Sequence, residues 1–176
     1  VGLSKVENKK MKKLSGGMKR RAGIAQAMLN NPKILILDEP TAGLDPNERI
    51  RFRNLISELS EDRLVLLSTH IVSDIEYIAN EILLMKDGKL MHKGTADEII
   101  NSMTETVWEC FVEKNMVSDF MKKYKISNMK SEADGVILRI ISHEKPFVNA
   151  QSVEASLEDV FLYYFGEKAG DENAAI

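Results

Sequence analysis

The sequence predicts an α/β fold with parallel core strands, followed by a small C-terminal α+β unit. Two continuous apolar runs, residues 33–38 and 64–68, have the length and composition of buried strands. Helical spacing of apolar residues precedes the first run and follows each of them, and strands joined through helices are typical of α/β proteins. From about residue 103 shorter strands alternate with turns, which indicates a second unit.

The helices of the first part have recognisable start and stop signals. Ser15 is a candidate N-cap for a helix over residues 15–30, which Pro32 ends. Asp45-Pro46 combines an N-capping acid with a proline at the first helical position, so a second helix begins there. A third, short helix over residues 71–80 follows the second strand. The order helix, strand, helix, strand, helix predicts a parallel sheet whose two strands are buried.

The second part is predicted from turn and capping signals. Asp87-Gly88 between two strands predicts a hairpin, and Thr95 with Glu98 forms a capping box. Strands are expected near residues 106–113, 126–131 and 136–142, and a helix near residues 115–124. Ser156 begins a final helix with one apolar face. The predicted domains are residues 1–103 and residues 104–176.

Composition excludes several classes of protein. The 176 residues are 44% hydrophobic and 29% charged, with a net charge of −3. No apolar run approaches the ~20 residues of a membrane helix, and one cysteine forms neither an internal disulfide nor a cysteine zinc cluster. The charge is uneven, because residues 1–21 carry eight basic groups against one acid, a local +7. Such a stretch is typical of a solvated helix face, and also of a surface that binds nucleic acid, anionic membrane or polyphosphate.

Ser15-Gly16-Gly17 stands where the first helix begins. The first turn of a helix has backbone amides without partners and a positive dipole end, and glycines let a ligand approach that backbone closely. This combination is suited to phosphate. Taken alone, such a segment is more often an ordinary capped helix than a phosphate site.

Two further candidates end the two predicted strands. Asp38-Glu39 follows the first strand, where a carboxylate can bind hydrated Mg²⁺ and a neighbouring one can orient or deprotonate water. His70 follows the second strand and is expected at the same sheet edge, where ligands bind in open α/β sheets. An acidic pair or a single histidine at a strand end is more often structural when it stands alone.

Together these segments resemble a known family. Leu14-Ser-Gly-Gly-Met18, Ile34-Leu-Ile-Leu-Asp-Glu39, Thr41-Ala-Gly-Leu-Asp-Pro46 and His70 resemble, in this order, the signature motif, Walker B strand, D-loop and switch histidine of the nucleotide-binding subunit of ABC transporters. The resemblance covers residues 1 to about 100 and implies a partial P-loop NTPase fold. The family often has glutamine where Met18 stands. The segment 156–161 also resembles, more weakly, a C-terminal segment of bacterial drug, lantibiotic and sodium exporters.

The resemblance implies a role for each motif residue. Ser15, Gly16 and Gly17 would contact ATP held by a second nucleotide-binding subunit, and Asp45 would link the two sites. Asp38 would bind Mg²⁺ through water, Glu39 would be the general base or would position the water, and His70 would sense the γ-phosphate. It also implies a transmembrane permease as partner, no nucleic acid, and a place on the cytoplasmic face of the membrane.

One motif of the family does not occur in the sequence. The only Gly-Lys pair is Gly88-Lys89, followed by leucine, so the phosphate-binding loop Gly-x-x-x-x-Gly-Lys-Ser/Thr is expected to precede residue 1. The chain is therefore expected to be the C-terminal part of an ATP-hydrolysing subunit that drives export and to be inactive alone. Two alternatives are a soluble ABC ATPase acting on ribosomes or DNA, and a non-catalytic interaction module.

Overall fold

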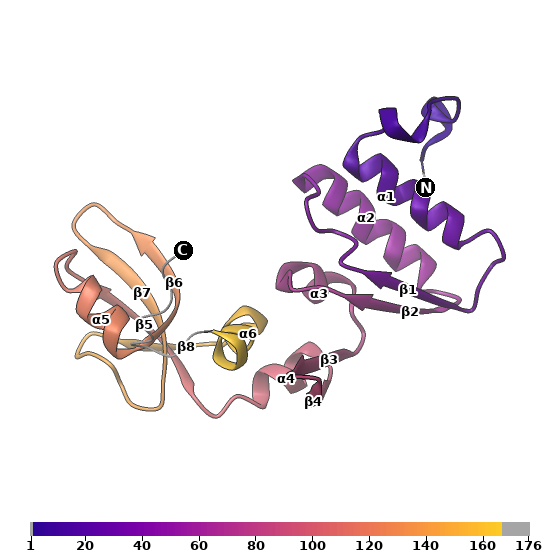
Figure 1. Cartoon of the computed structure of the whole chain (residues 1–176). Coiled ribbons are helices and arrows are strands. Elements are labelled where there is room, and N and C mark those ends of the chain that lie inside the picture. The colour runs from indigo at the N-terminus through magenta and orange to yellow at the C-terminus, as the bar shows by residue number, and fades with distance from the viewer. Residues whose placement is uncertain (1, 167–176) are drawn as a thin grey trace. The chain divides into compact units, whose positions relative to one another are not determined.

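The computed structural model describes residues 2–166, which divide into two compact units at residues 78 and 79 (Figure 1). This division lies before the domain boundary near residue 103 that the sequence indicates, because the hairpin after residue 81 groups with the later residues. The boundary near residue 103, where the sequence changes to shorter strands and turns, stays a prediction.

The first unit is built from three α-helices, two strands and two short 3₁₀ turns. Its elements are η1 (Ser4–Val6), η2 (Met11–Lys13), α1 (Gly16–Ala27), β1 (Ile34–Asp38), α2 (Pro46–Leu59), β2 (Leu64–Ser68) and α3 (Val72–Ile78). The predicted α/β order is confirmed, and β1 pairs with β2 in parallel, with Ile34 opposite Leu64 and Asp38 opposite Ser68. The helix predicted over residues 15–30 ends earlier, at Ala27, and Asn31 takes a left-handed φ of 44° before the strand.

One face of the parallel pair holds the core of this unit. Figure 1 shows α1 and α2 side by side next to β1 and β2. The buried side chains between them are Ile24, Leu44, Phe52 and Ile56, against which Leu37 and Val65 pack. The opposite face, formed by Ile34, Ile36, Leu64 and Leu66, is exposed. The expectation that both strands are fully buried is therefore wrong for this face, because the described helices of the unit cover the sheet from one side.

The second unit begins with a hairpin and a short helix. Strands β3 (Ile82–Lys86) and β4 (Lys89–Gly94) are antiparallel, and α4 (Ala96–Asn101) follows. Asp87 and Gly88 both have positive φ, 51° and 73°, as the predicted two-residue turn requires. Thr95 and Glu98 form the predicted capping box.

A four-stranded antiparallel sheet completes the second unit. Its strand order is β6-β7-β5-β8, and its elements are β5 (Thr106–Val112), α5 (Val117–Lys123), β6 (Lys125–Ser131), β7 (Val136–Ser142), β8 (Gln151–Val153) and α6 (Leu157–Phe165). Phe120 of α5 packs on one face, against Leu138 and Ile140. Alternation along β7 places Arg139 on the opposite face, where its side chain contacts α6. The strands and helices expected here are confirmed, whereas β8 was not predicted.

Candidate functional site

The candidate site lies where the two parallel strands end. Asp38 and Ser68 are opposite each other in the register, and the Ser68 hydroxyl donates a hydrogen bond of 2.5 Å to Asp38 Oδ1. Parallel pairing puts both carboxyl ends at one edge, which is the ligand-binding edge of open α/β sheets. The Asp38 carboxylate therefore lies at this edge, and one of its oxygens already accepts a hydrogen bond.

Glu39 follows with an unusual backbone conformation. Its φ is 42°, in the left-handed region that residues other than glycine adopt rarely. Its N–H donates to the carbonyl oxygen of Ser68 at 3.0 Å and lies 3.1 Å from the Ser68 hydroxyl oxygen. Non-glycine residues in this region concentrate at functional sites, so the conformation marks Glu39 independently of any motif.

The side chains of Glu39 and His70 meet at this edge. His70 Nδ1 lies 2.9 Å from Glu39 Oε1, as expected for residues that follow neighbouring parallel strands. The second carboxylate oxygen, Oε2, is shielded from solvent and has no hydrogen-bond partner among the described residues. A buried acceptor without a partner costs free energy, so a donor is expected there, and a water molecule would satisfy it.

These residues fit a magnesium ion only in part. Mg²⁺ in nucleotide sites uses one or two carboxylates together with water and substrate phosphates. Asp38 supplies an exposed carboxylate, whereas Glu39 Oε2 is shielded from solvent and has no hydrogen-bond partner among the described residues. Residues 2–166 contain no group of three or more His, Cys, Asp or Glu that could hold a metal. The site is therefore suited to a metal that arrives with a phosphate, rather than to one bound by protein alone.

The Ser15-Gly16-Gly17 segment begins α1 as predicted. The Ser15 hydroxyl accepts a hydrogen bond from the Met18 N–H at 3.3 Å. Space beside Gly16 is open, because a Cβ there would meet nothing within 4 Å. Within residues 2–166, no hydrogen bond or ion pair joins this segment to Asp38, Glu39 or His70. The two sets of candidates are thus separate.

Gly17 has a packing role that the sequence did not reveal. A Cβ at this position would lie 2.7 Å from Glu48 Oε2, on the first turn of α2. Glu48 is held there by Arg21 at 3.2 Å and Arg51 at 2.8 Å. The absence of a side chain at Gly17 therefore lets α1 and α2 approach each other. The sequence motif indicates this glycine only through the access that it gives to a ligand.

We expect Gly17→Ala to lower the free energy of unfolding by about 1–3 kcal/mol, because the methyl group displaces Glu48. Chemical unfolding of the purified chain measures this loss. Truncation at Glu48→Ala removes the obstacle, so the double variant should lose less stability than the two single losses added together. If the losses of the two single variants simply add in the double variant, the contact with Glu48 is not the cause of the loss in Gly17→Ala.

Asp45 caps α2, as predicted. Its Oδ1 accepts a hydrogen bond from the Glu48 N–H at 2.9 Å, and Pro46 occupies the first helical position. This cap fixes the end of the loop that begins at Glu39.

Arg20 is the residue at this site that sequence reasoning missed. One guanidinium nitrogen, Nη1, donates to the Glu39 carbonyl at 2.6 Å, and Nη2 donates to the Ala42 carbonyl at 2.7 Å. The sequence indicated only a basic stretch. The neighbouring lysines, Lys5, Lys9, Lys10, Lys12, Lys13 and Lys19, are exposed, in contrast to Arg20.

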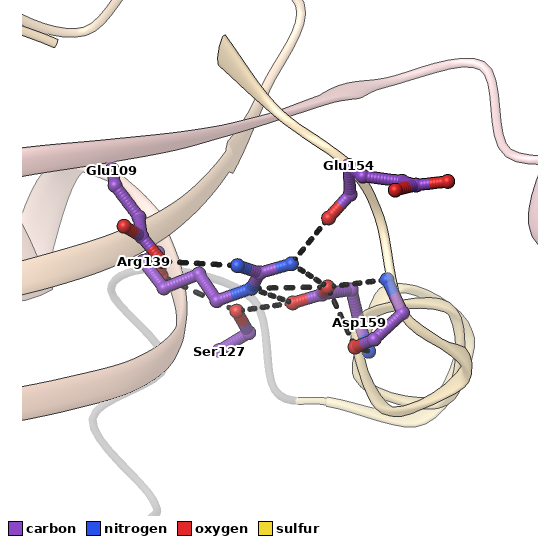
Figure 2. Close-up of polar contacts among 6 residues, drawn as sticks. Glu109, Ser127, Arg139, Glu154 and Asp159 are labelled. Atoms are coloured by element: carbon purple, nitrogen blue, oxygen red, sulfur yellow. Dashed lines mark hydrogen bonds and ion pairs between the residues drawn. The ribbon is translucent and has the colours of Figure 1, made fainter. Parts of the chain in front are cut away.

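A second polar cluster lies in the other unit, and Figure 2 shows it. Asp159 of α6 is 1% exposed and accepts hydrogen bonds from Arg139, Ser127 and Ser156. Arg139 also pairs with Glu109 at 3.1 Å and donates to the Glu154 carbonyl at 2.6 Å. Its charged groups satisfy one another, so the cluster is a structural clamp between sheet and helix.

The surroundings of Asp159 and Arg139 favour the charged form of both residues. Burial alone disfavours the charged form of Asp159, but the hydrogen bonds from Arg139, Ser127 and Ser156 hold its pKa below the ordinary value. The hydrogen bond to Asp159 raises the pKa of Arg139, against a smaller opposing effect of burial. Both residues are thus kept charged.

No helix within residues 2–166 combines the length and the apolar character that crossing a membrane requires.

The α/β fold is similar to that of a known class of protein, the ATP-binding cassettes. A solved structure of an ATP-binding cassette of an ABC transporter matches with a TM-score of 0.50 and 26% identity, over 55% of this chain and 38% of that one. The ABC transporter family model matches residues 1–42.

Curated relatives carry the same description. The bacitracin transport ATP-binding protein BcrA of Bacillus licheniformis is 34% identical over 94% of this chain and 60% of its own length. The Nod factor export ATP-binding protein I of Burkholderia thailandensis is 40% identical over 57% of this chain and 34% of its own. The ABC transporter ATP-binding protein YxlF of Bacillus subtilis is 38% identical over 66% and 39%. The chain is related to the ATP-binding subunits of bacterial ABC transporters, and it spans 34–60% of the length of these three relatives.

Proposed function

We propose that this chain is part of the ATP-hydrolysing subunit of an ABC transporter that drives export across a membrane. The observation that supports this most strongly is the arrangement at the edge of the parallel sheet, where Asp38, Glu39 and His70 lie together. There Glu39 Oε2 is a buried acceptor without a hydrogen-bond partner among the described residues. A relative whose name includes bacitracin transport supports a role in transport, and one whose name includes Nod factor export supports the outward direction.

Each of the three residues at this edge has a different role in the proposed reaction. Asp38 would hold Mg²⁺ through water, and the ion would supply neutralisation of charge on the phosphates of ATP. Glu39 Oε2 accepts a hydrogen bond from the attacking water and either orients it or takes its proton. His70 Nδ1, 2.9 Å from Oε1, restrains the carboxylate, and with both ring nitrogens protonated His70 would also donate from Nε2 toward the γ-phosphate.

The N-terminus of α1 acts at a second nucleotide. Ser15, Gly16 and Gly17 present backbone amides at a positive helix end, and the space beside Gly16 admits a phosphate. We propose that this segment contacts ATP held by a second copy of the subunit, and that Asp45 connects the two sites across that dimer. A transmembrane permease is the remaining partner, which places the subunit on the cytoplasmic face of the membrane.

The exposed lysines near the N-terminus favour a second candidate, an ABC ATPase that acts on nucleic acid. Binding of DNA or RNA that weakens steeply with salt, together with ATP turnover in the absence of any membrane partner, would support it. We expect no such binding by the full-length protein at physiological salt.

We expect residues 1–176 alone to release no phosphate from ATP above background. Phosphoryl transfer requires the backbone, lysine and Ser/Thr of a phosphate-binding loop, and the motif Gly-x-x-x-x-Gly-Lys-Ser/Thr does not occur among these residues. The measurement is phosphate release with Mg²⁺ at moderate salt, with Glu39→Gln as control. Mg²⁺-dependent turnover that Glu39→Gln abolishes would contradict this expectation.

A further inference from the structure

Arg20 connects helix α1 to the segment that follows β1. Its guanidinium donates from two different nitrogens to two backbone carbonyls, those of Glu39 at 2.6 Å and Ala42 at 2.7 Å. Hydrogen bonds from a charged donor are stronger than neutral ones, and a planar guanidinium fixes the relative direction of its two acceptors. One side chain therefore holds the start and the middle of the loop from Glu39 to Asp45.

The residue at the start of this loop needs such support. Glu39 has a φ of 42°, and a residue other than glycine stays in this region only where surrounding contacts impose it. On one side, its N–H is bound to the Ser68 carbonyl at 3.0 Å. On the other, its carbonyl accepts from the Ala42 N–H at 3.3 Å and from Arg20 at 2.6 Å. The bond from Arg20 is the shortest of the three.

The backbone conformation of Glu39 decides where its carboxylate lies. In the observed conformation Oε1 contacts His70 and Oε2 is the buried acceptor. In the common extended conformation the side chain would leave the backbone in another direction, and this arrangement would be lost. Whatever holds the backbone therefore also aims the carboxylate.

We propose that Arg20 is a positioning residue that holds Glu39 in its left-handed conformation and so aims the carboxylate at the attacking water. The mechanistic part of this inference rests on the proposed function, whereas the conformational part does not. Because Arg20 lies on the helix that begins at Gly16, the same contacts link the Ser15-Gly16-Gly17 segment to Glu39.

The first test is a double-mutant cycle in the full-length protein. We expect Arg20→Gln to lower kcat by roughly 10- to 100-fold with little change in KM, because a misplaced catalytic group slows reaction more than it weakens binding. Arg20→Lys keeps the charge without the planar fork and should give an intermediate kcat. In a Glu39→Gln background, Arg20→Gln should cost little further, because Arg20 acts through Glu39.

Arg51→Gln is the matched control. Arg51 also lies in the first unit, but its side chain is 65% exposed and pairs with Glu48 within the same helix, at 2.8 Å. We expect this variant to keep the wild-type kcat and melting temperature. An equal loss from Arg20→Gln in the wild-type and Glu39→Gln backgrounds would overturn the proposal, and so would an unchanged kcat.

The second test does not depend on activity. Amide hydrogen exchange of Glu39 and Ala42 should become roughly tenfold faster in Arg20→Gln, since both amides belong to the loop that Arg20 holds. Exchange in α2 and β2 should stay as in the wild type. Unchanged exchange at Glu39 and Ala42 would overturn the proposal even if the protein hydrolyses no ATP. Absent turnover in the wild type, or normal turnover of Glu39→Gln, would instead overturn the proposed function.

Discussion

Glu39→Gln in the full-length protein is expected to lower the rate of ATP hydrolysis by roughly 10²–10⁴-fold while ATP affinity changes little. The substitution keeps the size of the side chain and removes its ability to accept a proton. Binding depends mainly on contacts to the metal and the phosphates, so it is expected to survive. Steady-state phosphate release and equilibrium titration with ATP measure the two effects separately.

Glu58→Gln is a suitable control for this prediction. Glu58 is an exposed residue near the end of α2, so the same chemical change is made away from the sheet edge. We expect wild-type hydrolysis from this variant. Hydrolysis by Glu39→Gln at a near-normal rate would remove Glu39 from the role of general base or water-positioning residue.

The second large effect is expected in the clamp of Figure 2. Asp159→Asn should lower the free energy of unfolding by about 3–5 kcal/mol, because it leaves Arg139 without the buried charge that it pairs with at 2.8 Å. Urea unfolding at neutral pH measures this loss. Glu132→Gln, which breaks the exposed Lys130–Glu132 pair nearby, should leave stability unchanged within error. Equal losses of unfolding free energy from the two substitutions would show that the buried clamp stabilises the fold no more than an exposed ion pair does.

The clamp also predicts how stability depends on pH. The pKa of Asp159 is lower in the folded chain than its ordinary value of about 3.9. Its stabilising contribution is therefore complete above about pH 5 and is lost as the pH falls through the lower, folded pKa. Unfolding of the wild type at decreasing pH should show this loss, and Asp159→Asn should show a shallower dependence. Parallel pH curves for both proteins would contradict the assignment.

Local signals predicted most of the elements. The Asp45-Pro46 start of α2, the Asp87-Gly88 turn and the Thr95 capping box all depend on residues within four positions of one another, and all are confirmed. The parallel pairing of β1 with β2 also followed from the sequence, since the helix between them leaves that arrangement as the usual one.

The contacts that shape the sites depend on residues far apart in the chain. The Arg20 bond to the Glu39 carbonyl spans 19 positions, and nothing in a basic stretch distinguishes this arginine from its neighbours. The contact of Gly17 with Glu48 likewise exists only once α1 and α2 have packed together. The pairing of such residues follows from packing, so periodicity and capping rules could not reveal it.

The clamp gives a second example. The register of β6 shifts between Ile126 and Asn128, and Ser127 at this bulge donates to Asp159 at 2.6 Å. A bulge changes the direction of a side chain, and the strand contains no glycine or proline from which this bulge could be predicted. The Ser156 cap of α6 was predictable, whereas the partner that Asp159 finds on the sheet was not.

The most direct measurement for the proposed function is the mass of the full-length Glu39→Gln protein by sedimentation velocity, with and without ATP and Mg²⁺. If each nucleotide is held between Asp38 and Glu39 of one copy and the Ser15-Gly16-Gly17 segment of another, blocking hydrolysis should retain ATP between two copies. We therefore expect a dimer with ATP and Mg²⁺ and a monomer without them. A protein that binds ATP yet stays monomeric across the accessible range of protein concentrations would contradict this account.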